Sequence, residues 1–154
     1  MTLQDKIHLK PLDINNPDQL GFMFRVRCNP DIDKHLTGNA PKTYFEHVNY
    51  LSNVADNKYF HIIYYDDDFA GYCQTTMNKE TFEVGWALCP TKIGRGIGAV
   101  AVKLLLEFCK KLANKKIILY VKEDNVRAIS LYRKFNFIEK ENNNGIILME
   151  LHND

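Results

Sequence analysis

A glycine-rich segment in the middle of the chain, Gly94-Arg95-Gly96-Ile97-Gly98, joins an alternating apolar stretch to a long amphipathic one. The stretch before it, Thr81–Leu88, is typical of a strand, and Gly96–Ala113 carries apolar residues at helical spacing. Glycines allow a tight turn and a close approach to a ligand. The unpaired amides and the dipole of a helix start favour an anion, so we expect a strand–turn–helix unit with a pyrophosphate at the turn.

Other phosphate-binding loops do not match this segment. A Rossmann fingerprint needs G-x-G-x-x-G, whereas this loop reads G-x-G-x-G, and a Walker loop needs Gly-Lys-Ser/Thr, which is absent. Lys92 and Arg95 would add positive charge beside a bound anion. Taken alone, the loop is equally consistent with an ordinary tight turn between a strand and a helix.

The remaining pattern predicts an α+β fold with a central mixed, mostly antiparallel sheet flanked by helices. The order is β-α-α-β-β-β-α-β-α-β-β, with one parallel crossover around the Gly96–Ala113 helix. The expected strands are Ile7–Leu12, Tyr59–Tyr65, Phe69–Thr76, Thr81–Leu88, Lys116–Val121, Phe137–Lys140 and Ile146–Leu151. The other expected helices run from Asn16-Pro17-Asp18 to Asn29-Pro30-Asp31, from after Pro41, and over Asn125–Phe135.

Size and charge restrict the class of protein. A length of 154 residues suits one domain, 1–154. The formal net charge of +1 argues against a nucleic-acid or membrane partner bound by bulk electrostatics. No stretch approaches the roughly 20 apolar residues that span a bilayer. The first ten residues have no apolar core, so no signal peptide is expected, and we predict a cytoplasmic protein.

The four cysteines, Cys28, Cys73, Cys89 and Cys109, form no C-x-x-C pair and have no histidine cluster beside them. A disulfide framework or a zinc site is therefore not expected, and we assign no metal. Free thiols that serve as packing residues suit a reducing compartment.

A second motif follows the glycine loop in the segment Tyr120–Phe137. With the loop, it resembles the Gcn5-related N-acetyltransferase (GNAT) superfamily over roughly residues 58–150. The family's loop pattern is Gln/Arg-x-x-Gly-x-Gly/Ala, which Gly96-Ile97-Gly98 completes, while Ile93 departs from it at the Gln/Arg position. The family's second pattern is V-x-x-x-N-x-x-A-x-x-x-Y-x-K-x-G-F. It is matched at Asn125, Ala128, Tyr132, Lys134 and Phe137, with Asn136 in place of Gly.

The resemblance implies acetyl-CoA as co-substrate and assigns roles by position. Asn125 would hydrogen-bond the pantetheine arm, and Tyr132 would protonate the departing thiolate. Glu83 would take the amine proton directly or through water. The residues implied to bind the coenzyme are Trp86, Ala87, Leu88, Ile93, Gly94, Arg95, Gly96, Ile97, Gly98, Ala99, Asn125, Ala128 and Tyr132.

Each of these residues also has a structural interpretation. Asn125 is a typical helix cap, Tyr132 could be plain core, and Glu83 could be a solvent-facing residue of an alternating strand. The family mechanism is direct attack of the amine in a ternary complex, with no acyl-enzyme. A backbone N–H near Leu88 would polarise the carbonyl.

The acceptor is expected to bind through the N-terminal half. The segments Phe24–Ile32, Phe45-Glu46-His47 and Lys58-Tyr59-Phe60 resemble the matching segments of the nucleotide-sugar N-acetyltransferases of pseudaminic acid synthesis, which acetylate the 4-amino group of a UDP-linked sugar. The resemblance implies that Arg27, His47, Lys58 and Tyr59 line the acceptor pocket. Arg and Lys suit a diphosphate, and an aromatic ring suits a base or sugar face. The competing interpretation is that Arg27 and Lys58 are ordinary surface charges.

Two further functions remain open. One is acetylation of a protein or peptide amine, a polyamine or an antibiotic. The other is a non-catalytic acyl-CoA-binding module, against which the presence of Tyr132 and Asn125 argues. Homodimers are common in the family, but no sequence feature specifies the oligomeric state.

Overall fold

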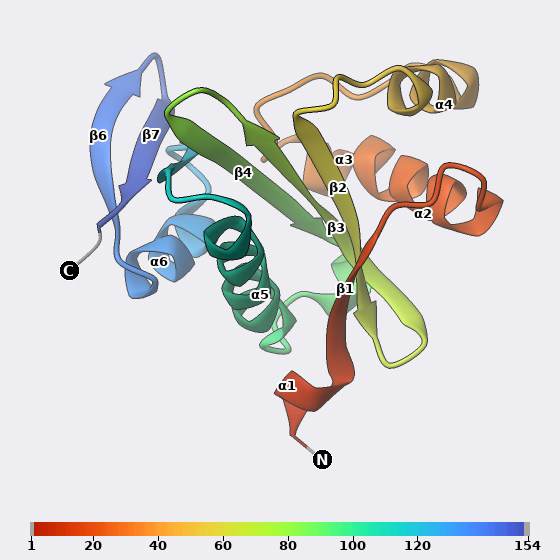
Figure 1. Ribbon diagram of the computed structural model, residues 1–154, viewed down its shortest axis with the longest axis horizontal. Helices are drawn as coiled ribbons and strands as arrows, with labels where there is room; N and C mark the ends of the chain where they lie inside the picture. Colours follow the sequence, from red (N-terminus) through yellow and green to blue (C-terminus); the bar gives the residue numbers. More distant parts are fainter. Residues whose placement is uncertain (1, 153–154) are drawn as a thin grey trace.

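The computed structural model describes residues 2–152 and shows one sheet with helices on both faces (Figure 1). The strands are β1 (Ile7–Pro11), β2 (Lys58–Tyr65), β3 (Asp68–Met77), β4 (Thr81–Leu88), β5 (Lys116–Lys122), β6 (Phe137–Asn143) and β7 (Ile146–Leu151). The helices are α1 (Leu3–Lys6), α2 (Pro17–Cys28), α3 (Pro30–Asp33), α4 (Tyr44–Ser52), the 3-10 turn η1 (Pro90–Lys92), α5 (Ile97–Leu112) and α6 (Val126–Lys134). Within the described range, no helix is long and apolar enough to cross a membrane.

The sheet has the order β1-β2-β3-β4-β5-β7-β6. Every neighbouring pair is antiparallel except β4 and β5, which run parallel because α5 carries the chain back between them. This arrangement confirms the predicted α+β class and the single parallel crossover.

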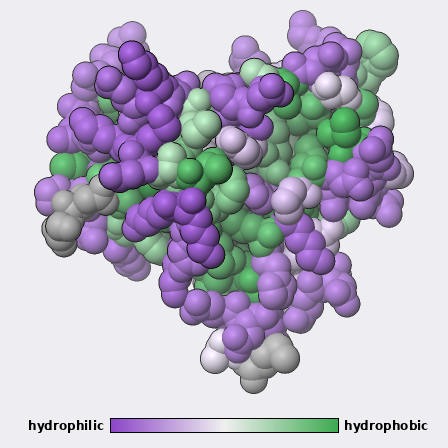
Figure 2. Space-filling model, viewed as in Figure 1, coloured by the Kyte–Doolittle hydropathy of each residue, from purple (hydrophilic) through white to green (hydrophobic). Residues whose placement is uncertain are grey.

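Two apolar cores lie on opposite faces of the sheet, as the alternation of the strands requires. On β4, Phe82, Val84 and Leu88 belong to the core beneath α5. Ala87 points the other way, into the smaller core that also contains Met23 of α2. Figure 2 shows polar residues over most of this view, with apolar residues at the surface between α5 and the α2–α4 layer.

The two parallel strands diverge after a short contact. Thr81–Glu83 of β4 pair with Lys116–Ile118 of β5, and no further pair joins these strands in the described structure. β5 continues against β7 as far as Lys122, while β4 continues against β3 as far as Leu88. The carboxyl-terminal half of β4 therefore has an open edge facing β5.

The structure differs from the predicted elements mainly at short helices. α1, α3 and η1 were not predicted. A capping box between Thr2 and Asp5 stabilises α1, and Asn29 caps α3 by accepting from the Asp31 amide at 2.9 Å. The last hairpin turns at Asn144-Gly145, both at positive φ, so β6 extends beyond the predicted Lys140.

Two buried histidines give the fold a defined pH dependence. Burial lowers the pKa of His47 and of His61 below the ordinary value, although the Leu20 carbonyl partly opposes the shift at His47. The unfolded chain therefore binds more protons than the folded chain below about pH 6.5. Stability is lost as the pH falls through that range.

We expect the urea midpoint of unfolding to decrease as the pH is lowered from 7.5 to 5.5. Each imidazole lowers the free energy of unfolding by at most about 1.4 kcal/mol per pH unit. His61→Phe should flatten this dependence, since the ring lies against Phe108 at 4.5 Å between centroids and its Nδ1 has no partner among residues 2–152. His8→Gln, at an exposed position, serves as the control. An unchanged pH dependence in His61→Phe would contradict the assignment.

Candidate active site

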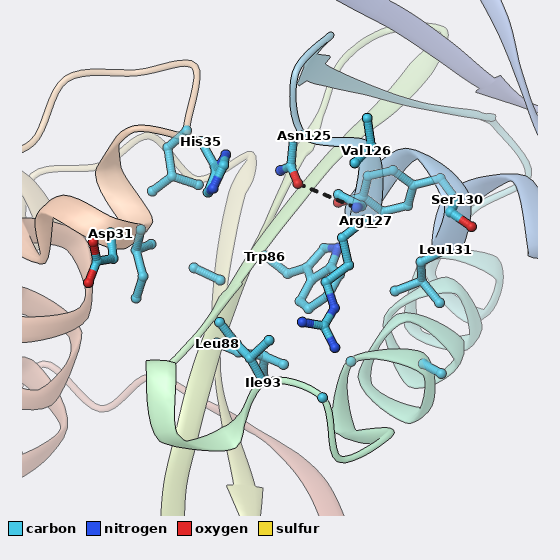
Figure 3. Close-up of a pocket in the computed structure, with 18 of the residues that line it drawn as sticks. Asp31, His35, Trp86, Leu88, Ile93, Asn125, Val126, Arg127, Ser130 and Leu131 are labelled. Carbon is cyan, nitrogen blue, oxygen red and sulfur yellow. Dashed lines mark hydrogen bonds between the residues drawn. The ribbon is translucent and has the colours of Figure 1, made fainter.

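A cavity of about 690 Å³ lies where β4 leaves β5 (Figure 3). Its walls come from four parts of the chain: the α3 segment within 31–36, the end of β4 at 86–88, the glycine loop within 93–99, and α6 with the two residues before it. We call it the large cavity. It brings together the glycine loop and the second motif, which lie about 30 residues apart in the sequence.

Trp86 forms part of the floor of the large cavity. Its ring packs against Gly98, where a Cβ would lie 2.7 Å from Cη2 and 2.9 Å from Cζ3. It also meets the ring of Tyr132 edge to face, with centroids 6.2 Å apart. The indole Nε1 is buried and, within residues 2–152, has no hydrogen-bond partner. The helix start can approach β4 this closely because residue 98 is a glycine.

The glycine loop presents an uncapped helix start to the large cavity. Gly94 and Gly96 have φ angles of 84° and 80°, which side chains other than glycine rarely adopt. Gly96 is the N-cap of α5 and supplies no side-chain acceptor. The first amides of α5 therefore have no capping side chain, which is the condition for binding an anion.

Arg127 adds a positive charge at the same loop. A Cβ on Gly94 would lie 3.1 Å from its Nη2, so the guanidinium lies over the loop. The residue is exposed and lines the large cavity from the first turn of α6. Arg127 was not predicted as a site residue, although it lies within the second motif, two residues after Asn125.

Asn125 and Tyr132 line the large cavity from α6. Asn125 caps the helix, its Oδ1 accepting from the Ala128 amide at 3.4 Å, which Figure 3 marks. Its Nδ2 donates to no protein atom among residues 2–152. Tyr132 is 7% exposed, and burial raises the pKa of its phenol above the ordinary range. The phenol is therefore protonated at neutral pH and available as a proton donor.

Most of the predicted coenzyme residues line the large cavity, but Arg95 and Ile97 do not. Arg95 lies over the ring of Tyr65 at 5.0 Å, and Ile97 is fully buried in the core. Glu83 also stands apart. It occupies the last position at which β4 pairs with β5, and it lines neither the large cavity nor the one described next.

A second cavity of about 420 Å³, the small cavity, lies between α2, α4 and strands β2 and β3. Arg27 and His47 line it. Arg27 Nη1 donates to Asp33 Oδ1 at 2.6 Å, and the His47 Nε2 lies 3.0 Å from the Leu20 carbonyl oxygen. Both residues are thus fixed by their neighbours.

Lys58 and Tyr59 do not line the small cavity. Lys58 Nζ donates to the Tyr50 hydroxyl at 3.3 Å, and Tyr50 is a lining residue, so Lys58 stands at the rim. Tyr59 lies on the opposite face of the sheet, where its ring meets Phe108 of α5 at 5.5 Å. Successive side chains of β2 point to opposite faces of the sheet, which separates Lys58 from Tyr59. Aromatic lining residues that were not predicted are Tyr50, Phe60 and Tyr72, and burial raises the pKa of Tyr72 to about 12.

No cysteine lines either cavity. All four thiols are free, and burial raises the pKa of Cys28, of Cys73 and, to about 11, of Cys109. Such thiols are poor nucleophiles at neutral pH. In the described chain, no group of three His, Cys, Asp or Glu side chains gathers as metal ligands would.

The glycine loop and the second motif lie within residues 28–137, which match the Acetyltransferase (GNAT) family. The chain belongs to the GNAT family. No curated protein is significantly similar to it in sequence. The family resemblance of the two motifs is thereby confirmed, and with it the family's acetyltransferase character.

Solved structures share this GNAT fold over nearly their whole length. A domain from Methanocaldococcus jannaschii has a TM-score of 0.82 at 22% identity, covering 95% of this chain and 97% of that one. Spermidine N-acetyltransferase from Vibrio cholerae, solved with CoA and spermine, has a TM-score of 0.81 at 17% identity, covering 95% and 94%. The N-acetyltransferase PseH from Campylobacter jejuni has a TM-score of 0.73 at 15% identity, covering 97% and 99%. At these identities the likeness shows the fold alone.

The contact between Gly98 and Trp86 gives this GNAT chain a test of its packing. Gly98→Ala should lower the free energy of unfolding by about 1–2 kcal/mol, because the displaced indole outweighs the better helix propensity of alanine. Gly85→Ala on β4 is the matched control: its Cβ meets nothing within 4 Å, so stability should stay within about 0.5 kcal/mol of wild type. Urea unfolding measures both, and equal stabilities would contradict the packing argument.

Proposed function

We propose that the chain is an acetyl-CoA-dependent N-acetyltransferase that transfers acetyl to a primary amine by direct attack in a ternary complex. The observation that carries the proposal is the large cavity, where an uncapped helix start, an open strand edge and a protonated phenol meet. These three features match the three parts of an acyl-CoA: pyrophosphate, pantetheine and thioester sulfur.

The coenzyme would bind along this line of features. The first amides of α5 would bind the pyrophosphate, with Arg127 compensating its charge. The pantetheine arm carries amide groups, and it would pair with the unpaired backbone edge of β4 at Trp86–Leu88. The Nδ2 of Asn125 would donate to the same arm.

The reaction needs a neutral amine near the thioester carbonyl and a proton for the leaving group. The amine nitrogen attacks the carbonyl carbon, the C–N bond forms, and the C–S bond breaks. Tyr132 would donate its phenolic proton to the thiolate, and the ring of Trp86 holds that phenol in place. Glu83 could take the amine proton only through water, since it lines neither cavity.

For the acceptor, we propose a nucleotide-linked amino sugar bound in the small cavity. Tyr50, Phe60 and Tyr72 supply aromatic faces for a base or sugar, and Arg27 and the rim residue Lys58 supply charge for a diphosphate. The fold neighbour PseH is an N-acetyltransferase of known structure, which is compatible with this class.

Polyamines are the second acceptor class, because a spermidine N-acetyltransferase shares the fold. A polyamine site needs carboxylates, and Glu46 is the carboxylate that lines the small cavity in the described chain. Aromatic groups therefore outnumber acidic ones there. A binding module without turnover is the remaining alternative.

Release of free thiol from acetyl-CoA tests the activity. We expect release with a UDP-4-amino sugar, none with spermidine or peptides, and a loss of about 100-fold or more in kcat for Tyr132→Phe. Tyr120→Phe is the matched control, since that side chain is exposed and lines neither cavity. Release with spermidine alone would replace the acceptor class. CoA binding without release from any amine would favour the binding module.

Calorimetric titration with CoA tests the anion site. Arg127→Gln should weaken CoA binding by about 10-fold, as expected for one charge-assisted contact worth roughly 1.5 kcal/mol. Arg133→Gln changes an exposed arginine of the same helix that does not line the large cavity, and its affinity should equal that of wild type. Equal losses in both variants would point to net charge alone.

A further inference from the structure

His35 follows α3 and lines the large cavity on the wall opposite α6. Figure 3 shows its ring directed across the cavity toward the side of Asn125. The Nδ1 is buried, and within residues 2–152 it has no hydrogen-bond partner. A buried ring nitrogen with no partner is costly, so such an atom in a cavity indicates a ligand that satisfies it.

The backbone that carries His35 is held in place from two sides. The His35 amide donates to the Ile32 carbonyl at 2.9 Å, and the Lys122 Nζ at the end of β5 donates to the Lys34 carbonyl at 2.8 Å. The ion pair between Arg27 and Asp33 attaches α3 to α2. These contacts hold the backbone of His35 at the edge of the large cavity.

The segment that contains His35 lies between the two cavities. Asp31 and Leu36 of the same segment line the large cavity, whereas Gly38 and Asn39 line the small one. The segment thus forms the wall between the proposed coenzyme site and the proposed acceptor site. An amine that reaches the thioester from the small cavity must pass this wall.

The other buried polar side-chain atoms without a partner do not share this position. Within the described residues they belong to His61, Thr75 and Trp86. His61 packs against Phe108 of α5, and neither His61 nor Thr75 lines the large or the small cavity. Trp86 lines the large cavity, but an indole N–H only donates. Among these four, His35 is the residue in a cavity that can accept a proton.

We infer that His35 is the catalytic base of the acetyl transfer, an inference that rests on the proposed function. The amine attacks the thioester carbon, which gives a tetrahedral adduct with a positively charged nitrogen. That nitrogen passes one proton to Nδ1 of His35 as the C–S bond breaks, and Tyr132 protonates the sulfur. His35 then releases its proton to solvent and the phenol regains one, so protons balance over a turnover.

Bromoacetyl-CoA tests this placement without any acceptor. Its CH₂Br carbon occupies the place of the acetyl methyl, so a nearby imidazole nitrogen displaces bromide and forms an N–C bond. We expect one adduct per chain, mapped to His35 by peptide mass spectrometry and suppressed by excess CoA. His35→Gln should lose the adduct and keep its calorimetric affinity for CoA. His8→Gln, altered at an exposed histidine of β1, should keep both.

The possible outcomes distinguish a failure of the proposed function from a failure of the role of His35. No CoA binding by the wild-type protein would overturn the proposed function. CoA binding with the suppressible adduct on another residue, or with no adduct, would overturn the role of His35. The site of the adduct in the wild-type protein tests the role of His35 even if His35→Gln does not fold.

Turnover with an accepted amine gives a second readout. His35→Gln should lower kcat by about 100-fold, whereas Glu83→Gln should stay within about threefold of wild type. The reverse order would assign the base to Glu83 and overturn the inference.

Discussion

The divergence of β4 from β5 is the constraint on which the candidate site depends. Parallel strands in one sheet normally share a continuous ladder, but here pairing ends at Glu83 and Ile118. Beyond that point each strand keeps its other neighbour, β3 or β7, so the sheet stays intact on both sides of the opening. The open edge leaves backbone groups of β4 that need partners, and an extended ligand with its own amides can supply them.

Residues of both motifs border this opening. α5 is the first α-helix after β4 and α6 is the first after β5, and residues at both helix starts line the large cavity. Gly98 lets α5 approach the Trp86 ring, and that ring meets Tyr132 of α6. The phenol is buried by these contacts, which raises its pKa and keeps it protonated. Trp86 and Tyr132 therefore contribute both to the packing of α6 against β4 and to the proposed chemistry.

The sequence predicted the parts of the site that depend on local backbone chemistry. The strand–turn–helix at Gly94–Gly98 and the cap at Asn125 follow from glycine and asparagine preferences, and both are present. Positions that depend on tertiary packing were not predictable from the sequence. Tyr59 was expected in the acceptor pocket, but the structure places it on the α5 face of β2. His35 lies in no motif, and Arg127 occupies a position of the second motif whose residue type the pattern does not specify, so the fold was needed to place both at the large cavity.

Hydrogen–deuterium exchange with and without acetyl-CoA is the most direct test of the claim that the coenzyme fills the gap between β4 and β5. We expect slower amide exchange over 86–100 and 125–128, because these segments border the large cavity. Exchange in the β6–β7 hairpin, 137–151, should stay unchanged, since no residue of the hairpin lines the large or the small cavity. Protection confined to the hairpin, or none at saturating acetyl-CoA, would contradict the account.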